Sequence, residues 1–370
     1  MMEKIKVYLQ YPWKFPDSPY YKYLVENPPA GIRFVNAEKF QKGVITNKRL
    51  FWLSNFLKKN IRGFMNLFNL SIPNAHKSPR GDYDLIHCAH CLSKNKDKPW
   101  VADIEGIWQF YIGNETKNAK KKVKEILLRK NCKKIMPWTQ TTANEIIKEF
   151  PEIKDKVEVI YPAVPLKKYK KIKHEEINLL FVARYFYAKG GLETLEAFDY
   201  LTKKHDNVNA LFVSPLSKEI LEKYRKNEKI KFYDLMPQDK LFKEIYPKAD
   251  IFVYPGYSDS FGFALLEVMS FGLPIITVDG FARKEIVEEG KSGFVISRPK
   301  IKWEKGRHII KEKDRKRLIL NIIKKTSLLI KNKNLREKMG KEGFKQVSQG
   351  KFSIKERNKK LRRIYEEAIK

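Results

Sequence analysis

The sequence predicts an α/β protein built from two doubly wound domains with parallel sheets. Short apolar runs alternate with helical patterns along most of the 370 residues. These runs are rich in Val, Ile and Phe without strict polar alternation, which is typical of parallel strands buried on both faces. The series occurs twice, on either side of a stretch that holds Pro162, Pro165 and several lysines and that we interpret as a linker. A length of 370 residues also fits two or three domains.

The predicted strands form two series. The first occupies residues 4–9, 31–35, 83–88, 99–104, 133–137 and 156–161. The second occupies residues 177–183, 209–214, 229–233, 250–254, 274–278 and 293–296. We therefore place the first domain at residues 1–168 and the second at residues 169–352, followed by a closing helix over 353–370. An aromatic-rich amphipathic helix expected at residues 50–70 is interpreted as core, with membrane contact as the alternative.

Charge is distributed unevenly along the chain. The formal net charge is +33, with 76 basic and 43 acidic side chains. Residues 166–297 hold 21 basic and 19 acidic side chains, whereas residues 298–370 hold 26 and 8. A positive field favours anionic partners such as nucleic acid, anionic lipid or phosphorylated substrates, and a Lys-rich composition alone is the plain alternative. Three cysteines and the lack of a long apolar run lead us to expect a protein of the cytoplasm, either free or peripheral at the inner membrane face.

Two carboxylates and a glycine lie in one predicted loop and helix of the second domain. The stretch from Ala249 reads as a strand, then a loop with Asp259, Phe261, Gly262 and Phe263, then a helix with Glu267. Such a loop follows the carboxyl end of a parallel strand, where open α/β sheets bind ligands. Carboxylates accept hydrogen bonds from sugar hydroxyls, and backbone amides at a helix start attract anions.

Two cations lie in another loop at the same predicted edge of the sheet. The strand at 177–183 ends directly before Arg184, and Lys189 follows five residues later, just before Gly190 and Gly191. An arginine fork and a lysine point charge suit a pyrophosphate. Cations and carboxylates at one crevice therefore predict a ligand with both phosphate and hydroxyl groups.

These motifs resemble those of the retaining glycosyltransferases of family 4, the group 1 glycosyl transferases. Arg184 to Gly190 is similar to the family's Arg-x4-Lys-Gly, and Asp259 to Glu267 is similar to its Glu-x7-Glu. The resemblance covers about residues 177–370 well and the first half loosely. It implies the GT-B fold, with two Rossmann-like domains whose sheets face each other across a cleft. It also implies a closing helix that crosses back to the first domain.

The resemblance also implies roles for individual residues in a hexosyltransferase that uses a nucleoside diphosphate sugar. Arg184 and Lys189 would bind the donor diphosphate and stabilise the leaving nucleotide, and Glu267 would bind the ribose. Asp259 and the amides from Phe261 through Gly262 to Phe263 would hold the transferred sugar. Asp259 departs from the pattern because the family usually has Glu there, which is one methylene longer.

In the first, acceptor-side domain, the resemblance draws attention to a carboxylate after the strand at 99–104. Glu105 stands where the family has an active-site His, so Glu105 is expected to face the reacting centre, with Asp103 as a neighbour. A carboxylate there could stabilise positive charge at the anomeric carbon or accept the proton of the acceptor.

No metal and no other cofactor is expected. Cations and helix amides can neutralise the leaving diphosphate, which is itself part of the donor substrate. The run from His87 to Cys91 contains two His and two Cys, but adjacent strand residues point to opposite faces and rarely close a tetrahedral site.

The expected partners are a sugar nucleotide donor, an acceptor of unknown identity and, as an open alternative, an anionic membrane surface. The closing helix carries four cations, Lys359, Lys360, Arg362 and Arg363. If this surface docks on a membrane, neutralising them is expected to abolish binding to anionic vesicles and to leave activity unchanged. Two other functions stay open: a basic nucleic-acid-binding protein, for which no recognition motif is present, and an epimerase or phosphorylase on the same fold.

Overall fold

The computed structural model describes most of the chain and divides it into two compact units. The described residues are 4–11, 19–40, 56, 60, 63, 70–166, 169–257, 261–304 and 307–370. Unit 1 comprises Met1–Pro165 and Lys351–Lys370, and unit 2 comprises Leu166–Gly350. The boundaries predicted from the sequence lie close by, after residues 168 and 352. The amphipathic helix expected at residues 50–70 lies outside the described residues, apart from positions 56, 60, 63 and 70.

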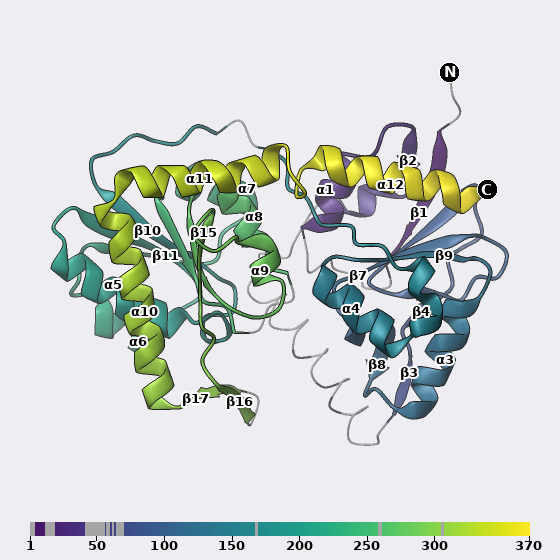
Figure 1. The fold of residues 1–370 in the computed structure, drawn as a ribbon, viewed down its shortest axis with the longest axis horizontal. Helices are drawn as coiled ribbons and strands as arrows, with labels where there is room; N and C mark the ends of the chain where they lie inside the picture. Colours follow the sequence, from purple (N-terminus) through teal and green to yellow (C-terminus); the bar gives the residue numbers. More distant parts are fainter. Residues whose placement is uncertain are drawn as a thin grey trace. The chain divides into compact units, whose positions relative to one another are not determined.

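Unit 1 contains a five-stranded parallel sheet in the order β2-β1-β5-β7-β9 (Figure 1). Its strands are β1 (Ile5–Gln10), β2 (Ile32–Phe34), β5 (Leu85–Ala89), β7 (Trp100–Ile104) and β9 (Cys132–Pro137). Every residue of β5 and β7 is buried, as expected for central parallel strands covered on both faces. Among the described residues, the α-helices of this unit are α1 (Tyr20–Glu26), α3 (Lys117–Leu128), α4 (Gln140–Glu149) and α12 (Ile354–Ile369).

The strand predicted at residues 156–161 is wrong. The chain makes one isolated bridge there, between Val157 and Ile135 of β9, after a 3-10 helix over Pro151–Lys156. Glu158 N and Ile160 N donate to Ile135 O and Pro137 O, both at 3.0 Å. A full ladder cannot continue past Pro137, because proline has no N–H to donate in return.

Short paired strands flank the main sheet of unit 1. β3 (Ser71–Pro73) pairs antiparallel with β8 (Tyr111–Gly113), and β4 (Ala75–His76) pairs parallel with β6 (Leu92–Ser93). These pairs bracket the loops that follow β5 and β7, and so they help to shape that end of the sheet.

Unit 2 contains a six-stranded parallel sheet in the order β12-β11-β10-β13-β14-β15. Its strands are β10 (Ile177–Val182), β11 (Val208–Val213), β12 (Ile230–Tyr233), β13 (Ile251–Tyr254), β14 (Ile275–Val278) and β15 (Gly293–Ile296). Each of the six strands predicted in this region is confirmed within one residue at either end. A hairpin of β16 (Ile301–Glu304) and β17 (Arg307–Ile310) follows the sheet.

Helices cover both faces of this second sheet. They are α5 (Gly191–Lys204), α6 (Lys218–Tyr224), α7 (Gln238–Lys240), α8 (Phe263–Met269), α9 (Arg283–Ile286), α10 (Glu312–Lys331) and α11 (Lys333–Ser348). Helix α11 packs against α8 at Gly340, where a Cβ would lie 1.9 Å from Gly272 O. Only glycine permits this approach, which fixes the end of α8 against the carboxyl-terminal helices.

The closing helix α12 belongs to unit 1, although it follows unit 2 in the sequence (Figure 1). Ser353 caps its first turn by accepting a hydrogen bond from Glu356 N at 3.3 Å. Leu361, Ile364 and Tyr365 are buried, and Arg357 donates to Asn27 O at 2.7 Å. The predicted return of the last helix to the first domain is therefore confirmed.

Candidate functional site

The predicted phosphate-binding loops of unit 2 lie at the point where the order of the sheet reverses. From β10 the chain moves outward to β11 and β12, and it then returns to β13 on the other side of β10. The carboxyl ends of β10 and β13 therefore form a topological switch point, where open α/β sheets bind their ligands. Arg184 and Lys189 follow β10, whereas Phe261, Gly262 and Glu267 follow β13.

Backbone hydrogen bonds join these two loops directly. Gly256 N donates to Lys189 O at 3.1 Å, and Tyr257 N donates to Ala188 O at 2.9 Å. Gly190 has a φ of +71°, and a Cβ there would lie 2.8 Å from Pro255 Cβ. The glycine after Lys189 thus serves both the left-handed turn and the close contact of the loops. The side chains of Arg184 and Lys189 are partly buried at this junction.

The second loop enters α8 through Gly262, which has a φ of +91°. Phe261 is fully buried, and its ring lies 5.2 Å from that of Phe263. The packed rings fix the backbone at the start of α8, where the predicted sugar contacts lie. Asp259 falls outside the described residues, so its assigned role stays a prediction.

The carboxylate of Glu267 is oriented by two side chains that the sequence analysis missed. Glu267 is 5% exposed and accepts a hydrogen bond from Tyr246 Oη at 2.8 Å. Its other oxygen accepts a hydrogen bond from Gln238 Nε2. Burial and the Glu267 carboxylate raise the pKa of Tyr246 well above its usual range, so this hydroxyl stays a donor. Both partners precede β13, and no motif in the sequence marks them.

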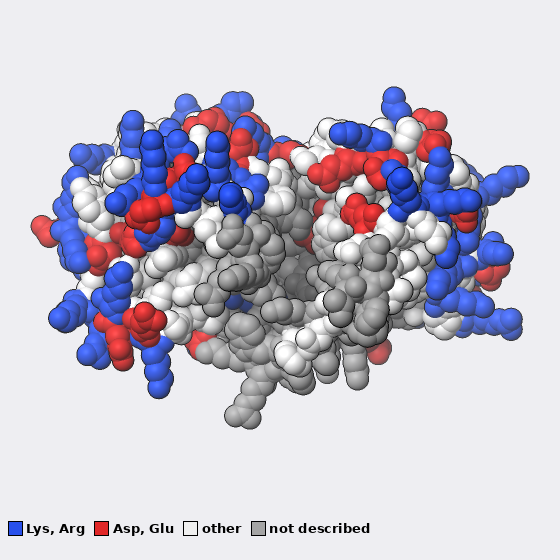
Figure 2. Space-filling model, turned by 90° about the horizontal axis from the view of Figure 1, so that it is seen from below, with Lys and Arg blue, Asp and Glu red and all other residues white. Residues whose placement is uncertain are grey.

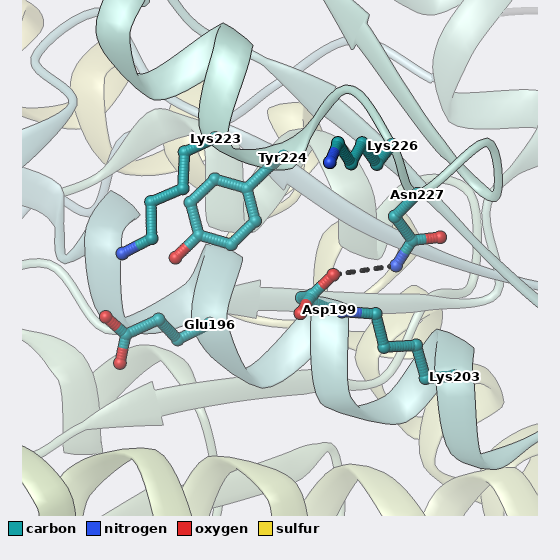
Figure 3. A pocket seen from close by; sticks show the side chains of 7 residues that line it. All are labelled: Glu196, Asp199, Lys203, Lys223, Tyr224, Lys226 and Asn227. Atoms are coloured by element: carbon teal, nitrogen blue, oxygen red, sulfur yellow. Dashed lines mark hydrogen bonds and ion pairs between the residues drawn. The ribbon is translucent and has the colours of Figure 1, made fainter.

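A polar hollow of about 350 Å³ lies between α5 and α6 (Figure 3). Its lining residues are Glu196, Asp199, Lys203, Lys223, Tyr224, Lys226 and Asn227. Asp199 already accepts from Lys203 Nζ at 2.7 Å and from Asn227 Nδ2 at 2.8 Å. The hollow lies by the end of α5 and the start of β12, at the amino edge of the sheet. It therefore belongs to the edge opposite Arg184 and Lys189, and we assign it no ligand.

In unit 1, Glu105 lies directly after β7 with its backbone held on both sides. Glu105 N donates to Gln109 Oε1 at 2.8 Å, and Glu105 O accepts from Thr142 Oγ1 at 3.0 Å. Gln109 Oε1 also lies 3.1 Å from His90 Nδ1. Glu105 is therefore a partly buried carboxylate at the carboxyl edge of the first sheet, on a rigid turn.

Beneath this edge, buried side chains of three elements meet the closing helix. His87 Nε2 lies 2.9 Å from Asp103 Oδ2, and His87 Nδ1 lies 2.6 Å from Tyr365 Oη of α12. Tyr21 Oη donates to the other oxygen of Asp103. Asp103 is 1% exposed, so it supports this network and does not share a solvent-accessible site with Glu105.

The cysteines beside His87 face another neighbour. Cys88 Sγ and Cys91 Sγ lie 3.5 and 3.6 Å from Gln10 Nε2, and burial raises the pKa of the Cys88 thiol well above its usual range. Across the part of the chain that the structure describes, no group of three or more His, Cys, Asp or Glu side chains is arranged to hold a metal ion. Nor is any helix in that part both long and apolar enough to span a bilayer.

Comparison with known proteins places this geometry in a family. Residues 165–346 match the sequence model of the family Glycosyl transferases group 1. The matched region is therefore a group 1 glycosyl transferase domain. The match covers most of unit 2, including every described residue that we assign to the donor site.

Curated relatives align with this chain over part of their length. The capsular polysaccharide biosynthesis glycosyltransferase CapM of Staphylococcus aureus is 25% identical over 192 residues, which cover 50% of this chain and 45% of the relative. A probable sucrose-phosphate synthase of Thermosipho melanesiensis is 29% identical over 173 residues, covering 43% and 40%. The chain thus spans less than half the length of these curated relatives.

Solved structures match the whole chain at low identity. A glycosyltransferase of Rickettsia africae has a TM-score of 0.66 at 15% identity, with both chains covered completely. HepE of Anabaena in complex with UDP-glucose has a TM-score of 0.61 at 14% identity, covering 98% of this chain and all of HepE. These matches confirm the predicted GT-B fold of the chain.

Proposed function

We propose that this group 1 glycosyltransferase transfers a hexosyl group from a nucleoside diphosphate sugar to an acceptor hydroxyl, with retention of the anomeric configuration. The observation that carries the proposal is the junction of the two loops at the switch point of unit 2. It joins a loop with two cations to a loop that leads to an oriented carboxylate. A ligand that has both phosphates and hydroxyls suits that combination. HepE, a structural neighbour, binds UDP-glucose.

On this proposal, each donor residue has a defined task. Arg184 and Lys189 bind the diphosphate and stabilise the charge that develops on the leaving nucleotide. Glu267, held by Tyr246 and Gln238, accepts hydrogen bonds from the ribose hydroxyls. Asp259 and the backbone from Phe261 to Phe263 hold the transferred sugar. No metal is assigned, because the two cations supply the positive charge.

Glu105 is proposed to serve the reacting centre from unit 1. Its backbone is fixed by Gln109 and Thr142, so the carboxylate projects from a rigid position. A carboxylate there can stabilise the positive charge at the anomeric carbon or accept the proton of the acceptor hydroxyl. Either role affects turnover more than donor binding.

The donor assignment is tested by truncating its two cations. Losing a charge-assisted contact typically costs about 1.5 to 3 kcal/mol, so Arg184→Ala and Lys189→Ala should each lower donor affinity and turnover at least tenfold. Thermal-shift titration and turnover assays with UDP, GDP and ADP sugars measure both quantities. Lys203→Ala is the matched control, because Lys203 lies at the opposite edge of the sheet. Wild-type affinity and turnover in both donor variants would contradict the assignment.

We further propose that the acceptor, or the membrane that carries it, is anionic and contacts α10. Basic side chains spread over the surfaces of both units, with acidic side chains among them (Figure 2). On α10, exposed cations and leucines alternate at helical spacing: Lys313, Arg317, Leu320, Lys324, Leu328 and Lys331. Leu320 is 65% exposed and Leu328 is 44% exposed. Apolar anchors among lysines are typical of a helix that lies on an anionic surface.

The closing helix fits this role less well than the sequence analysis expected. Arg362 pairs with Glu366 at 2.7 Å, and Arg363 pairs with Glu367 at 3.0 Å. These neighbouring carboxylates offset much of the positive charge on that face. The α10 face is therefore the better candidate for contact with an anionic surface.

Vesicle binding tests this surface. Each lysine near an anionic membrane contributes about 1 kcal/mol, so replacing Lys313, Lys324 and Lys331 with Gln should weaken binding to phosphatidylglycerol vesicles roughly a hundredfold. The control replaces three exposed lysines of unit 1, namely Lys355, Lys359 and Lys370. Failure of the intact chain to bind, or equal loss in the two triple variants, would contradict a docking face on α10.

A further inference from the structure

An arginine outside the predicted motifs is buried next to the donor loops. Arg283 begins the short helix α9 after β14 and is 0% exposed. Its Nη2 donates to Gly256 O at 3.1 Å, and its Nε donates to Thr277 Oγ1 at 3.2 Å. The guanidinium also lies 5.6 Å from the ring centroid of Tyr254. Burying a charge is costly unless its donors are satisfied, and here they are directed at specific groups of β13 and β14.

The contacts of Arg283 are built into the backbone around it. Thr277 Oγ1 accepts from Arg283 and donates to Tyr254 O at 2.8 Å, which ties the guanidinium to the end of β13. Gly256 has a φ of +46°, and a Cβ there would lie 2.3 Å from Arg283 Nη2. The guanidinium thus occupies space that only a glycine leaves open.

A second arginine holds the next carbonyl along the chain. Arg298, which follows β15, donates from Nη2 to Tyr257 O at 2.7 Å and lies over the ring of Phe281 at 5.1 Å. Partial burial and the positive charge of Arg283 lower the pKa of Arg298.

The segment Gly256–Tyr257 is therefore fixed from two directions. Its two carbonyls accept hydrogen bonds from Arg283 and Arg298, and its two amides donate to Lys189 O and Ala188 O. This two-residue segment links β14 and β15 to the loop that carries Arg184 and Lys189. Any movement of Gly256 and Tyr257 would move the two amides to which that loop is hydrogen-bonded.

We infer that Arg283 is a positioning residue of the donor site, acting through Gly256 and Tyr257 on the loop that holds Arg184 and Lys189. It keeps that loop in a binding-competent conformation before the donor arrives, without contacting the donor itself. Such preorganisation lowers the entropic cost of binding. The effect on donor affinity rests on the proposed function, whereas the coupling between Arg283 and the loop does not.

Hydrogen–deuterium exchange tests the coupling without a ligand. In Arg283→Gln, the amides of Gly256 and Tyr257 should exchange at least tenfold faster than in the wild-type chain, with faster exchange also in residues 184–191. Arg357→Gln is the matched control, because Arg357 is 1% exposed and donates to a backbone carbonyl of unit 1. It should leave exchange in both segments of unit 2 unchanged. Wild-type exchange at Gly256 and Tyr257 in Arg283→Gln would overturn the inference.

Thr277→Val provides a milder second variant should Arg283→Gln fail to fold. It removes the hydroxyl that accepts from Arg283 Nε and keeps the shape of the side chain. Exchange at Gly256 and Tyr257 should rise in the same direction and by less. Equal protection in Thr277→Val and the wild-type chain would count against the inference.

Calorimetric titration with UDP, GDP and ADP then tests the consequence for the donor site. Arg283→Gln should bind the preferred nucleotide at least tenfold more weakly, and Arg283→Lys should recover only part of that loss, because lysine lacks the fork. Faster exchange with unchanged affinity would overturn the positioning role. A wild-type chain that binds none of the three nucleotides would instead overturn the proposed donor site. Hydrogen–deuterium exchange would then still test whether Arg283 is coupled to the loop.

Discussion

The carboxyl edges of the two sheets are stabilised by different kinds of contact. In unit 2, the loops after β10 and β13 are joined by backbone hydrogen bonds, and Gly190 and Gly262 provide the turns. In unit 1, the corresponding edge depends on buried side chains, among which His87 connects Asp103 with Tyr365 of the closing helix. The two proposed donor loops of unit 2 are thus joined to each other through their backbones, whereas the elements of unit 1 are joined at this edge through buried side chains.

The two edges therefore differ in what their side chains do. In unit 2, the loops joined by backbone hydrogen bonds carry Arg184 and Lys189, which we propose bind the donor. In unit 1, the side chain of Asp103 is part of the buried network, and its neighbour Glu105 is the carboxylate that we propose takes part in the reaction. The comparison predicts that variants of the two edges affect stability and nucleotide affinity differently.

The largest effect is expected at the buried network of unit 1. Asp103→Ala leaves His87 and Tyr21 without their shared carboxylate, and removing one partner of a buried pair costs about 3–5 kcal/mol. The free energy of unfolding from urea titration should fall by about that amount, while nucleotide affinity stays unchanged. Asp82→Ala is the control, because that exposed carboxylate pairs with Lys6 at the surface, and its loss should not shift the midpoint. A large fall in nucleotide affinity in Asp103→Ala would remove the distinction between the two edges.

The next effect concerns the chemistry assigned to unit 1. Glu105→Gln keeps the size of the side chain and removes its charge, so kcat should fall at least about a hundredfold, as is typical for loss of a general acid or base. Donor KM and the unfolding midpoint should stay near their wild-type values, because Glu105 is anchored through its backbone. A change in KM without a change in kcat would contradict a role in the reaction and would indicate that Glu105 contributes to binding.

A smaller effect is expected when the carboxylate of Glu267 loses one of its hydrogen-bond donors. Tyr246→Phe removes one of the two hydrogen bonds that orient Glu267, so donor affinity should fall about tenfold or less. Tyr224→Phe is the control. Like Tyr246, Tyr224 is a tyrosine whose pKa is raised by burial and nearby carboxylates, in this case to about 12. Unlike Tyr246, it lies by the opposite edge of the sheet. Equal affinities in the two variants, measured by calorimetry, would show that Glu267 needs no support from Tyr246.

Most of the fold could be predicted because parallel strands buried on both faces leave a clear apolar signal. The six strands of unit 2 and the return of the last helix are found where the sequence placed them. The error at residues 156–161 arises because an apolar run reveals burial, whereas a ladder also needs donors on its neighbour, which Pro137 lacks.

The donor loops could be predicted because their residues are close in sequence. The residues that hold these loops in place could not be predicted. Arg184 and Lys189 form one short motif, whereas Tyr246 and Gln238 reach Glu267 from 21 and 29 residues away. Arg283 is equally hidden, because its partner Gly256 lies on a different strand–helix connection. Such contacts depend on how the elements pack, and packing leaves no local pattern.

The assignment of α12 to unit 1 has a consequence for synthesis on the ribosome. Unit 2 is one continuous segment, so it can fold as soon as Leu166–Gly350 has emerged. Unit 1 cannot complete its buried network until Tyr365 has been translated, long after His87 and Asn27 have left the exit tunnel. Residues 1–165 therefore lack the contacts of α12 while the whole of unit 2 is synthesised. Helix α12 thus determines when unit 1 can complete its fold on the nascent chain.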